Sequence, residues 1–466
     1  MTLAVETSCD DTSVAIVEKA YQHGRVTAQL HFHEKVTSNN SLYQGVHPLV
    51  SLQSHQESLA ILLREAIRHL PVRNGEILAD AGAGAVQPGD VDITKRRLPD
   101  FISVTRGPGM RSNLFTGLDT AKGLAVAWQK PLVGVHHMQA HALTPRMVSA
   151  LESHARTLPN ESTMQAPSSD ELAPKFPFLS VLASGGHTLL IHSASLTDHR
   201  VLGSTNDIAI GECLDKIARV VLPAELLQTT KSTMYGALLE AFAFPGISPG
   251  GPTTAKQTAL LSRQSTCSAE AYLSAHGYQY KWYEVPANHE DAMRRSTTKW
   301  GWALNKPLTR SGGGIKINSL EMSFSGITTM VERIVRHGMD PVTKKFNKSE
   351  RAAADIDIEE RRDLARETMR ATFEHVASRV VLGLQSQQDI AAPKPAVVLA
   401  GGVAANSLLR HMYVYPMTST CGHSRLVLKI DYADLRPDSH VPFALTDFQT
   451  LNFIFLLPNS VPTMLL

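Results

Sequence analysis

A strand–polar turn–strand pattern occurs twice in this chain, once near residue 3 and again near residue 178. In the first copy, LAVETSCDDTSVAIVEK, two apolar, β-branched runs flank a polar turn. The second copy, FPFLSVLASGGHTLLIHSA, has a Gly–Gly turn in the equivalent place. Each copy predicts a β-hairpin. Because stretches with helical spacing follow both, we expect a duplicated α/β fold, in which two similar lobes hold a ligand in the cleft between them.

Stretches rich in Pro, Gly and Ser divide the chain into segments. Its 466 residues are enough for roughly two to three domains. A segment rich in Ser, Pro and Glu, 148–175, predicts a surface loop or linker. We therefore expect a first lobe at 1–147, a second at 176–415 with a long insertion near 245–320, and a divergent tail at 416–466.

Periodicity predicts several of the helices and strands. Helical spacing of apolar residues is found in HPLVSLQSHQESLAILLREAIRHL, in GECLDKIARVVL and over 352–387. FISVTRGPGMRSNLFTGLDTAKGLAVAW predicts a strand, a turn and a helix, and PLVGVHHMQAHALTPRM predicts a short strand that enters a helix. KPAVVLAGGVAANSLLRHM predicts a strand whose Gly–Gly turn opens a helix.

Composition limits the classes of function. Lys and Arg total 45 against 43 Asp and Glu, and the net charge of +2 excludes a strongly basic nucleic-acid binder but leaves local basic patches open. The 4 cysteines are scattered without a CxxC motif, which indicates a reducing compartment and neither a disulfide framework nor a thiolate zinc site. No uninterrupted apolar run is long enough to span a membrane, and no presequence is visible.

A pair of histidines, His137 and His141, stands four residues apart in VHHMQAHAL. On a helix this spacing places both imidazoles on one face, where they can reach a single metal ion. The same spacing also arises by chance in a chain with 20 histidines. The pair is therefore a candidate metal site that depends on its surroundings.

Three glycine-rich turns could bring backbone amides close to an anion. SGGHT, Ser184–Thr188, lies in the second hairpin, and its paired glycines permit positive φ. AGGVAAN, Ala400–Asn406, follows a strand and could place a helix N-terminus at a phosphate. The third turn, in TRGPGMR at 105–111, is flanked by Arg106 and Arg111. These arginines could meet an anionic ligand or RNA phosphate. Plain turns and solvated arginines explain the same residues.

Two further segments have simple structural interpretations. GECLDKIAR predicts an exposed charged helix face made of Glu212, Asp215, Lys216 and Arg219. SFSG, Ser323–Gly326, predicts a helix N-cap.

Taken in their order along the chain, the motifs resemble those of one family. Together they resemble the motifs of the tRNA N6-adenosine threonylcarbamoyltransferases, once labelled O-sialoglycoprotein endopeptidases. The motifs are ETSCDDT, RGPG, HHMQAHAL, SGGHT, GECLDKIAR, SFSG and AGGVAAN. HHMQAHALT is similar to the organellar and bacterial branch, and the chain resembles the fungal mitochondrial members. The resemblance runs from residue 2 to about residue 410.

The resemblance implies a fold, a reaction and a set of partners. The fold is the duplicated actin-like ATPase fold, with two lobes that close on a nucleotide. The reaction transfers the threonylcarbamoyl group of threonylcarbamoyl-adenylate to N6 of the adenosine beside the anticodon, in tRNAs that read ANN codons. It further implies one divalent metal ion, iron or zinc, a mitochondrial location, and a homodimer as a candidate assembly. No membrane is implied.

The resemblance also assigns residues. Metal ligation falls to His137 and His141. Contact with the phosphate and acyl end of the adenylate falls to Leu182, Ala183, Ser184, Gly185 and Gly186. Contact with the ribose and base falls to Asp215, Gly236, Glu240 and Asn406.

The C-terminal region departs from the family pattern. The family has a Cys–Thr–Asp–Asn-type segment after AGGVAAN, whose Asp is a third metal ligand, whereas here the resemblance ends after about Tyr415. Asp431 and Asp434 lie near enough in sequence to be considered. Two alternatives remain: a zinc peptidase, which has no HExxH base because Met138 and Gln139 stand between the histidines, and an inactive nucleotide-binding homologue.

Overall fold

The computed structural model divides into two compact units, one within Met1–Lys175 and one that begins at Phe176. The description below covers the following residues: 1–22, 25–43, 45–73, 93–155, 172–229, 235–245, 280, 282–284, 291, 294–295, 297–304, 306–308, 318–387, 396–419 and 427–430. Asp431 and Asp434 lie outside them.

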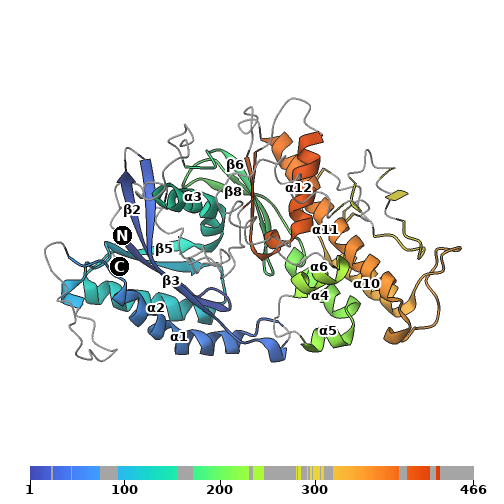
Figure 1. Ribbon diagram of the computed structural model, residues 1–466, viewed down its shortest axis with the longest axis horizontal. Coiled ribbons are helices and arrows are strands. Elements are labelled where there is room, and N and C mark those ends of the chain that lie inside the picture. Colours follow the sequence, from blue (N-terminus) through green and yellow to red (C-terminus); the bar gives the residue numbers. More distant parts are fainter. Residues whose placement is uncertain are drawn as a thin grey trace. The chain divides into compact units, whose positions relative to one another are not determined.

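The first unit is built on a mixed five-stranded sheet of order β3-β2-β1-β4-β5 (Figure 1). Its strands are β1 (Thr2–Glu6), β2 (Asp11–Gln22), β3 (Arg25–Thr37), β4 (Phe101–Gly107) and β5 (Leu132–His136). β1 and β2 form the antiparallel hairpin that the sequence predicts, and β3 continues it antiparallel to β2. β4 pairs parallel with β1, and β5 pairs parallel with β4.

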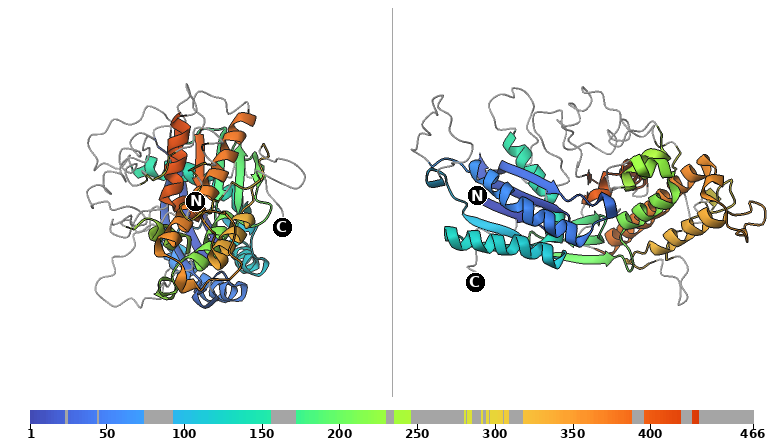
Figure 2. Two further views of the ribbon diagram at one scale, coloured as in Figure 1. Left: turned by 90° about the vertical axis from the view of Figure 1, so that its right-hand side faces the viewer. Right: turned by 90° about the horizontal axis from the view of Figure 1, so that it is seen from below.

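Three helices cover the two faces of this sheet: α1 (Pro48–Arg68), α2 (Arg111–Trp128) and α3 (His137–Ala155). α1 and α2 lie side by side on one face, and α3 lies on the other (Figures 1 and 2). Leu3, Val5 and Ile16 of the hairpin pack against Leu59 and Leu63 of α1 in a fully apolar core. Two short 3-10 helices, η1 (Ser41–Tyr43) and η2 (Ile93–Lys95), lie in the connections.

The second unit repeats the same topology in a sheet of order β10-β9-β6-β7-β8. Its strands are β6 (Phe178–Ala183), β7 (Thr188–Ser193), β8 (His199–Ser204), β9 (Ala396–Ala400) and β10 (Val427–Ile430). β6, β7 and β8 form an antiparallel meander, and β9 and β10 add to β6 in parallel. The second predicted hairpin is therefore confirmed, and both sheets share one strand order and one set of directions.

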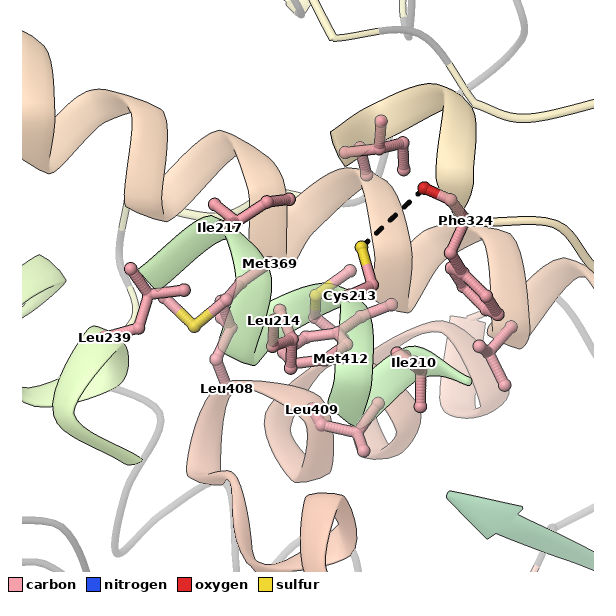
Figure 3. Packing of buried hydrophobic residues seen from close by; sticks show 14 of the residues in the cluster. Ile210, Cys213, Leu214, Ile217, Leu239, Phe324, Met369, Leu408, Leu409 and Met412 are labelled. Atoms are coloured by element: carbon pink, nitrogen blue, oxygen red, sulfur yellow. Dashed lines mark hydrogen bonds between the residues drawn. The ribbon is translucent and has the colours of Figure 1, made fainter. Parts of the chain in front are cut away.

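The helices of the second unit enclose a large apolar core. Among the described residues they are α4 (Ile210–Val221), α5 (Ala224–Thr229), α6 (Tyr235–Ala243), α10 (Ser325–His337), α11 (Ile358–Ser386) and α12 (Ser407–Ser419), with the short 3-10 helices η4 (Ala353–Asp355) and η6 (Gly402–Ala405). Cys213 and Ile217 of α4 pack with Met369 of α11 and Leu408 of α12 (Figure 3). The Cys213 thiol donates to the carbonyl of Phe324 at 3.7 Å.

Two boundaries differ from the expectation. α3 continues to Ala155, into the segment predicted as a linker from 148, because Met147 and Ala150 are buried at helical spacing and keep the helix on the sheet. The helix expected to open at the AGGVAAN glycines begins only at Ser407, after the turn of η6.

Parts of the predicted insertion belong to the core of the second unit. Tyr280 and Trp302 are fully buried, and the Trp302 indole N–H donates to Glu360 of α11 at 3.1 Å. The Trp300 indole N–H donates to Asp363 of the same helix at 2.9 Å. Within the described parts of the chain, none of the helices is long and apolar enough to cross a membrane.

Candidate functional site

The histidine pair lies in the first unit, at the start of α3 directly after β5. His137 and His141 are 8% and 7% exposed, so both imidazoles are almost buried. Their ring centroids are 4.8 Å apart and their planes meet at 87°. The structure therefore brings the two predicted ligands together on one helix face.

A carboxylate that the sequence reading did not single out lies behind His137. Glu6, the last residue of β1, has its Oε2 atom 3.6 Å from Nδ1 of His137. The backbone N–H of Ser8 donates to Glu6 Oε1 at 2.6 Å, and the Thr105 hydroxyl on the neighbouring strand donates to Oε2. Burial alone would raise the pKa of Glu6, but His137 and the hydrogen bonds from Ser8 and Thr105 lower it to about 2.

The turn after Glu6 is fixed by the RGPG segment and by α2. The N–H of Met110 donates to the carbonyl of Ser8 at 2.9 Å, and the Asn113 amide donates to the carbonyl of Cys9 at 2.6 Å. A Cβ at Gly109 would lie 2.7 Å from the Ser8 carbonyl oxygen, so glycine is needed for this close approach. Among the described contacts, the RGPG turn and the start of α2 hold the ETSCDD turn in place. The guanidinium of Arg111 lies over the Phe115 ring.

The donor chemistry around His137 and His141 fits a metal ion in part. Two neutral imidazoles one turn apart suit iron or zinc, and a carboxylate beside Nδ1 is a usual companion of a metal-binding histidine. A third ligand is not found among the described residues, where no three His, Cys, Asp or Glu side chains gather closely enough to hold an ion.

The second unit brings the other predicted residues together at the end of β6. Leu182 and Ala183 are strand residues with buried side chains. Ser184 begins the turn, and its hydroxyl accepts a hydrogen bond from the N–H of His187 at 3.0 Å. Gly185 and Gly186 do not take the positive φ that glycine permits. A Cβ on either would meet no atom within 4 Å, so these glycines leave open space beside the backbone.

Two other glycines hold neighbouring segments against this turn. The N–H of Gly211, in α4, donates to the Ser184 carbonyl at 3.1 Å, and a Cβ there would lie 2.7 Å from that oxygen. Gly401, after β9, has φ +95°, and a Cβ there would lie 2.5 Å from the carbonyl oxygen of Ala183. SGGHT, GECLDKIAR and AGGVAAN therefore converge, as a shared ligand site requires.

Asp215 faces α6 instead of the exposed surface that the charged-helix interpretation predicted. Its carboxylate accepts from the N–H of Gly236 at 2.8 Å. Burial raises the pKa of Asp215 to about 6, against the opposing effects of that hydrogen bond and of Arg219. Glu212 and Lys216 are half-exposed and form an ion pair at 2.7 Å, and Arg219 is exposed, so these three fit the predicted charged face.

Glu240 and Asn406 meet at the N-terminus of α12. Glu240 is buried and accepts from the backbone N–H of Ser407 at 2.8 Å and from its hydroxyl at 2.5 Å. The Asn406 side-chain carbonyl accepts from the N–H of Leu409 at 3.1 Å. Burial raises the pKa of Glu240 despite these donors. Both residues thus anchor α12 beside the glycine turns.

The SFSG segment is capped from outside. α10 begins within SFSG, as predicted, but its N-cap residue is Phe324, and the hydroxyls of Ser323 and Ser325 both donate to Asp207 at 2.6 Å. Asp207 also accepts from the N–H of Phe324 at 2.9 Å. Burial raises the pKa of Asp207, but these hydrogen bonds outweigh it and hold that pKa well below its usual range.

The fold is thus an α/β protein with two mixed sheets of identical strand order, carrying an imidazole pair in one unit and glycine turns in the other. The family model for tRNA N6-adenosine threonylcarbamoyltransferase matches residues 31–155 and 148–248. A mitochondrial tRNA N6-adenosine threonylcarbamoyltransferase of Schizosaccharomyces pombe is 30% identical over 88% of this chain and 71% of its own.

Two bacterial relatives carry the same name without the mitochondrial label. The Magnetococcus marinus protein is 36% identical over 47% of this chain and 51% of its own. The Rhizobium etli protein is 27% identical over 88% of this chain and 78% of its own. The chain belongs to the tRNA N6-adenosine threonylcarbamoyltransferase family and is an acyltransferase that modifies tRNA, as the motifs predicted. None of these relatives is named a peptidase.

Proposed function

We propose that this enzyme transfers the threonylcarbamoyl group of threonylcarbamoyl-adenylate to N6 of the adenosine beside the anticodon, in tRNAs that read ANN codons, and that one divalent metal ion assists. The observation that carries the proposal is the pair of buried imidazoles, His137 and His141, with ring centroids 4.8 Å apart in a chain of this family. The duplicated actin-like arrangement of two lobes is part of the proposal, and the shared strand order of the two sheets supports it.

His137 and His141 would hold the metal ion, and substrate atoms would supply further ligands. Bound there, iron or zinc would act as a Lewis acid toward the carbamoyl carbonyl and orient the threonyl group. The acyl-adenylate is already activated, so this chain needs no covalent nucleophile. Its remaining task is to place the adenosine amine for attack.

The glycine turns of the second unit would receive the adenylate. Gly185, Gly186 and Gly402 all have open space where a Cβ would stand, which lets a ligand approach their backbone amides. Amides placed at a phosphate stabilise the charge that develops as AMP departs. Asp215 and Gly236, joined by their 2.8 Å hydrogen bond, would contact the ribose, and Glu240 and Asn406 would support the base side of the site through α12.

A basic turn of the second unit, residues 339–348, would contact tRNA phosphates. Lys344, Lys345 and Lys348 are all exposed on it. The turn is ordered by the bridge between Met339 and Phe346 and by the hydrogen bond from the N–H of Lys344 to the Asp340 carbonyl, 2.9 Å. A preformed cluster of cations loses little conformational entropy on binding a phosphate backbone.

The proposal also covers location and assembly. A mitochondrial location is supported by the mitochondrial name of the Schizosaccharomyces pombe relative. A homodimer is also proposed, and Phe115 and Val126, 47% and 54% exposed on α2, are candidate contact residues for it. Light scattering of the purified chain, with Phe115→Asp as the disrupting variant, would measure the assembly.

The decisive assay incubates the purified full chain with synthetic threonylcarbamoyl-adenylate, Fe²⁺ or Zn²⁺, and an unmodified ANN-decoding tRNA. Mass spectrometry of the digested tRNA should show threonylcarbamoyladenosine. A tRNA that reads other codons and the variant His141→Ala serve as controls and should give none. Absence of the modified nucleoside with every divalent metal tested, or cleavage of a sialoglycoprotein in its place, would overturn the proposal.

A further inference from the structure

We propose that Glu6 is a positioning residue for His137, which holds the Nδ1–H tautomer of the imidazole so that the lone pair of the ring lies on Nε2. The inference rests on the proposed metal site, because Nε2 is then the nitrogen that binds the ion. Glu6 opens the ETSCDDT motif at the end of β1, but the motif alone assigns it no role.

The geometry places a fixed carboxylate against one nitrogen of the ring. Glu6 Oε2 is 3.6 Å from His137 Nδ1, and the Ser8 hydroxyl oxygen is 3.2 Å from the same atom. Glu6 is 5% exposed and His137 8%, so water does not screen the contact effectively. A lone pair on Nδ1 would face the negative carboxylate, whereas a proton on Nδ1 faces the carboxylate and a hydroxyl oxygen that can accept it.

The carboxylate is itself held in place from two directions. The Ser8 backbone N–H donates to Oε1 at 2.6 Å, and the Thr105 hydroxyl donates to Oε2 from the adjacent parallel strand. A buried carboxylate requires such partners, since an unpaired buried charge is strongly unfavourable. With both oxygens accepting hydrogen bonds, the Glu6 carboxylate is held in a fixed orientation beside the ring of His137.

The chemical consequence is a defined donor atom. A neutral imidazole carries one proton, and the nitrogen without it is the metal ligand. Carboxylates that hold the other ring N–H of a metal-binding histidine fix the tautomer and raise ligand basicity, and their loss costs about 10- to 100-fold in metal affinity. The same loss is expected here, with the shape of the site preserved.

The test compares wild type with Glu6→Gln, which keeps the side-chain shape but removes the charge. Full-length protein labelled with ¹⁵N-histidine gives the tautomer of His137 by long-range ¹H–¹⁵N correlation, with His137→Gln used for assignment. Wild type should show a protonated Nδ1, and Glu6→Gln should show a shift toward protonated Nε2. Zn²⁺ titration by calorimetry should show affinity about 10- to 100-fold weaker in the variant.

Glu18→Gln is the matched control. Glu18 lies in the same sheet, on β2, and its Oε2 is 3.0 Å from Nε2 of another histidine, His31. The control should leave both the His137 tautomer and Zn²⁺ affinity unchanged. If Glu6→Gln fails to fold, Thr105→Val loosens the carboxylate without removing it and should give a smaller change in the same direction.

The outcomes separate this inference from the proposed function. An unchanged tautomer and unchanged Zn²⁺ affinity in a folded Glu6→Gln variant would overturn the role of Glu6. Wild-type protein that binds no metal would overturn the proposed metal site, and the tautomer measurement would still decide whether Glu6 orients the ring.

Discussion

Asp215 is half-buried in α4, where its carboxylate accepts a hydrogen bond from Gly236. Burial raises its pKa to about 6, above the ordinary value of 3.8. The folded protein therefore holds the Asp215 proton more tightly than the unfolded chain does. The resulting stabilisation is fully present below about pH 4 and is lost as the pH rises through about 6.

We predict that Asp215→Asn removes this titration. Between pH 5 and pH 7 the free energy of unfolding of wild type should fall by about 1 kcal/mol relative to that of the variant. Urea denaturation of ligand-free protein at several pH values measures the difference. Asp119→Asn, which changes an exposed carboxylate on α2, is the control, and a wild type that tracks Asp215→Asn at every pH would contradict the assignment.

Asp207 acts at the scale of elements, because it joins the segment before α4 to the start of α10. Its carboxylate accepts from the hydroxyls of Ser323 and Ser325 and from the backbone of Phe324. Asp207→Ala should lower the free energy of unfolding by about 2 kcal/mol, since it leaves several donors without their acceptor. Chemical denaturation measures this. Asp198→Ala, at an exposed pair with Arg200, should change stability by less than about 0.5 kcal/mol.

The basic turn at 339–348 makes a prediction about salt. Neutralising its three exposed lysines, in the triple variant Lys344→Ala, Lys345→Ala and Lys348→Ala, should weaken tRNA binding several-fold. The slope of log affinity against log salt should fall by about 2, because fewer counterions are released from the RNA. The triple Lys→Arg variant keeps the charge and should bind as wild type does. An equal slope in all three proteins would exclude the turn from the RNA interface.

Local patterns made the hairpins, the main helices and the helical placement of His137 and His141 predictable. Contacts between distant segments were not. Glu6 acquires its role only when β1 pairs in parallel with β4 and meets Thr105, and a single sequence does not encode that register visibly. The hydrogen bonds from SFSG to Asp207 could not be predicted either, because they join segments more than a hundred residues apart in the sequence.

At the scale of the whole molecule, the proposed metal site lies within the first unit and the proposed adenylate site lies within the second. The imidazole pair depends on β1, β4 and α3 of the first unit, and the glycine turns depend on β6, β9 and α4 of the second. The two sheets have the same strand order, so each unit supplies the carboxyl ends of parallel strands as a platform. Binding of metal and binding of adenylate should therefore be separable by mutation.

We predict that Gly186→Val and His141→Ala fail in different ways. A Cβ at Gly186 would meet no atom within 4 Å, so we expect the valine variant to fold with unchanged thermal stability and to bind Zn²⁺ normally. It should lose at least about tenfold in affinity for a non-hydrolysable threonylcarbamoyl-adenylate analogue, because its side chain fills the space the ligand needs. His141→Ala should bind the analogue but lose Zn²⁺ affinity and turnover.

Gly211→Val is the steric control: its Cβ would lie 2.7 Å from the Ser184 carbonyl oxygen, so the thermal stability of this variant should fall. Calorimetric titration of both ligands into all three variants decides the matter, and a Gly186→Val variant that binds the analogue as wild type does would remove the glycine turn from the adenylate site.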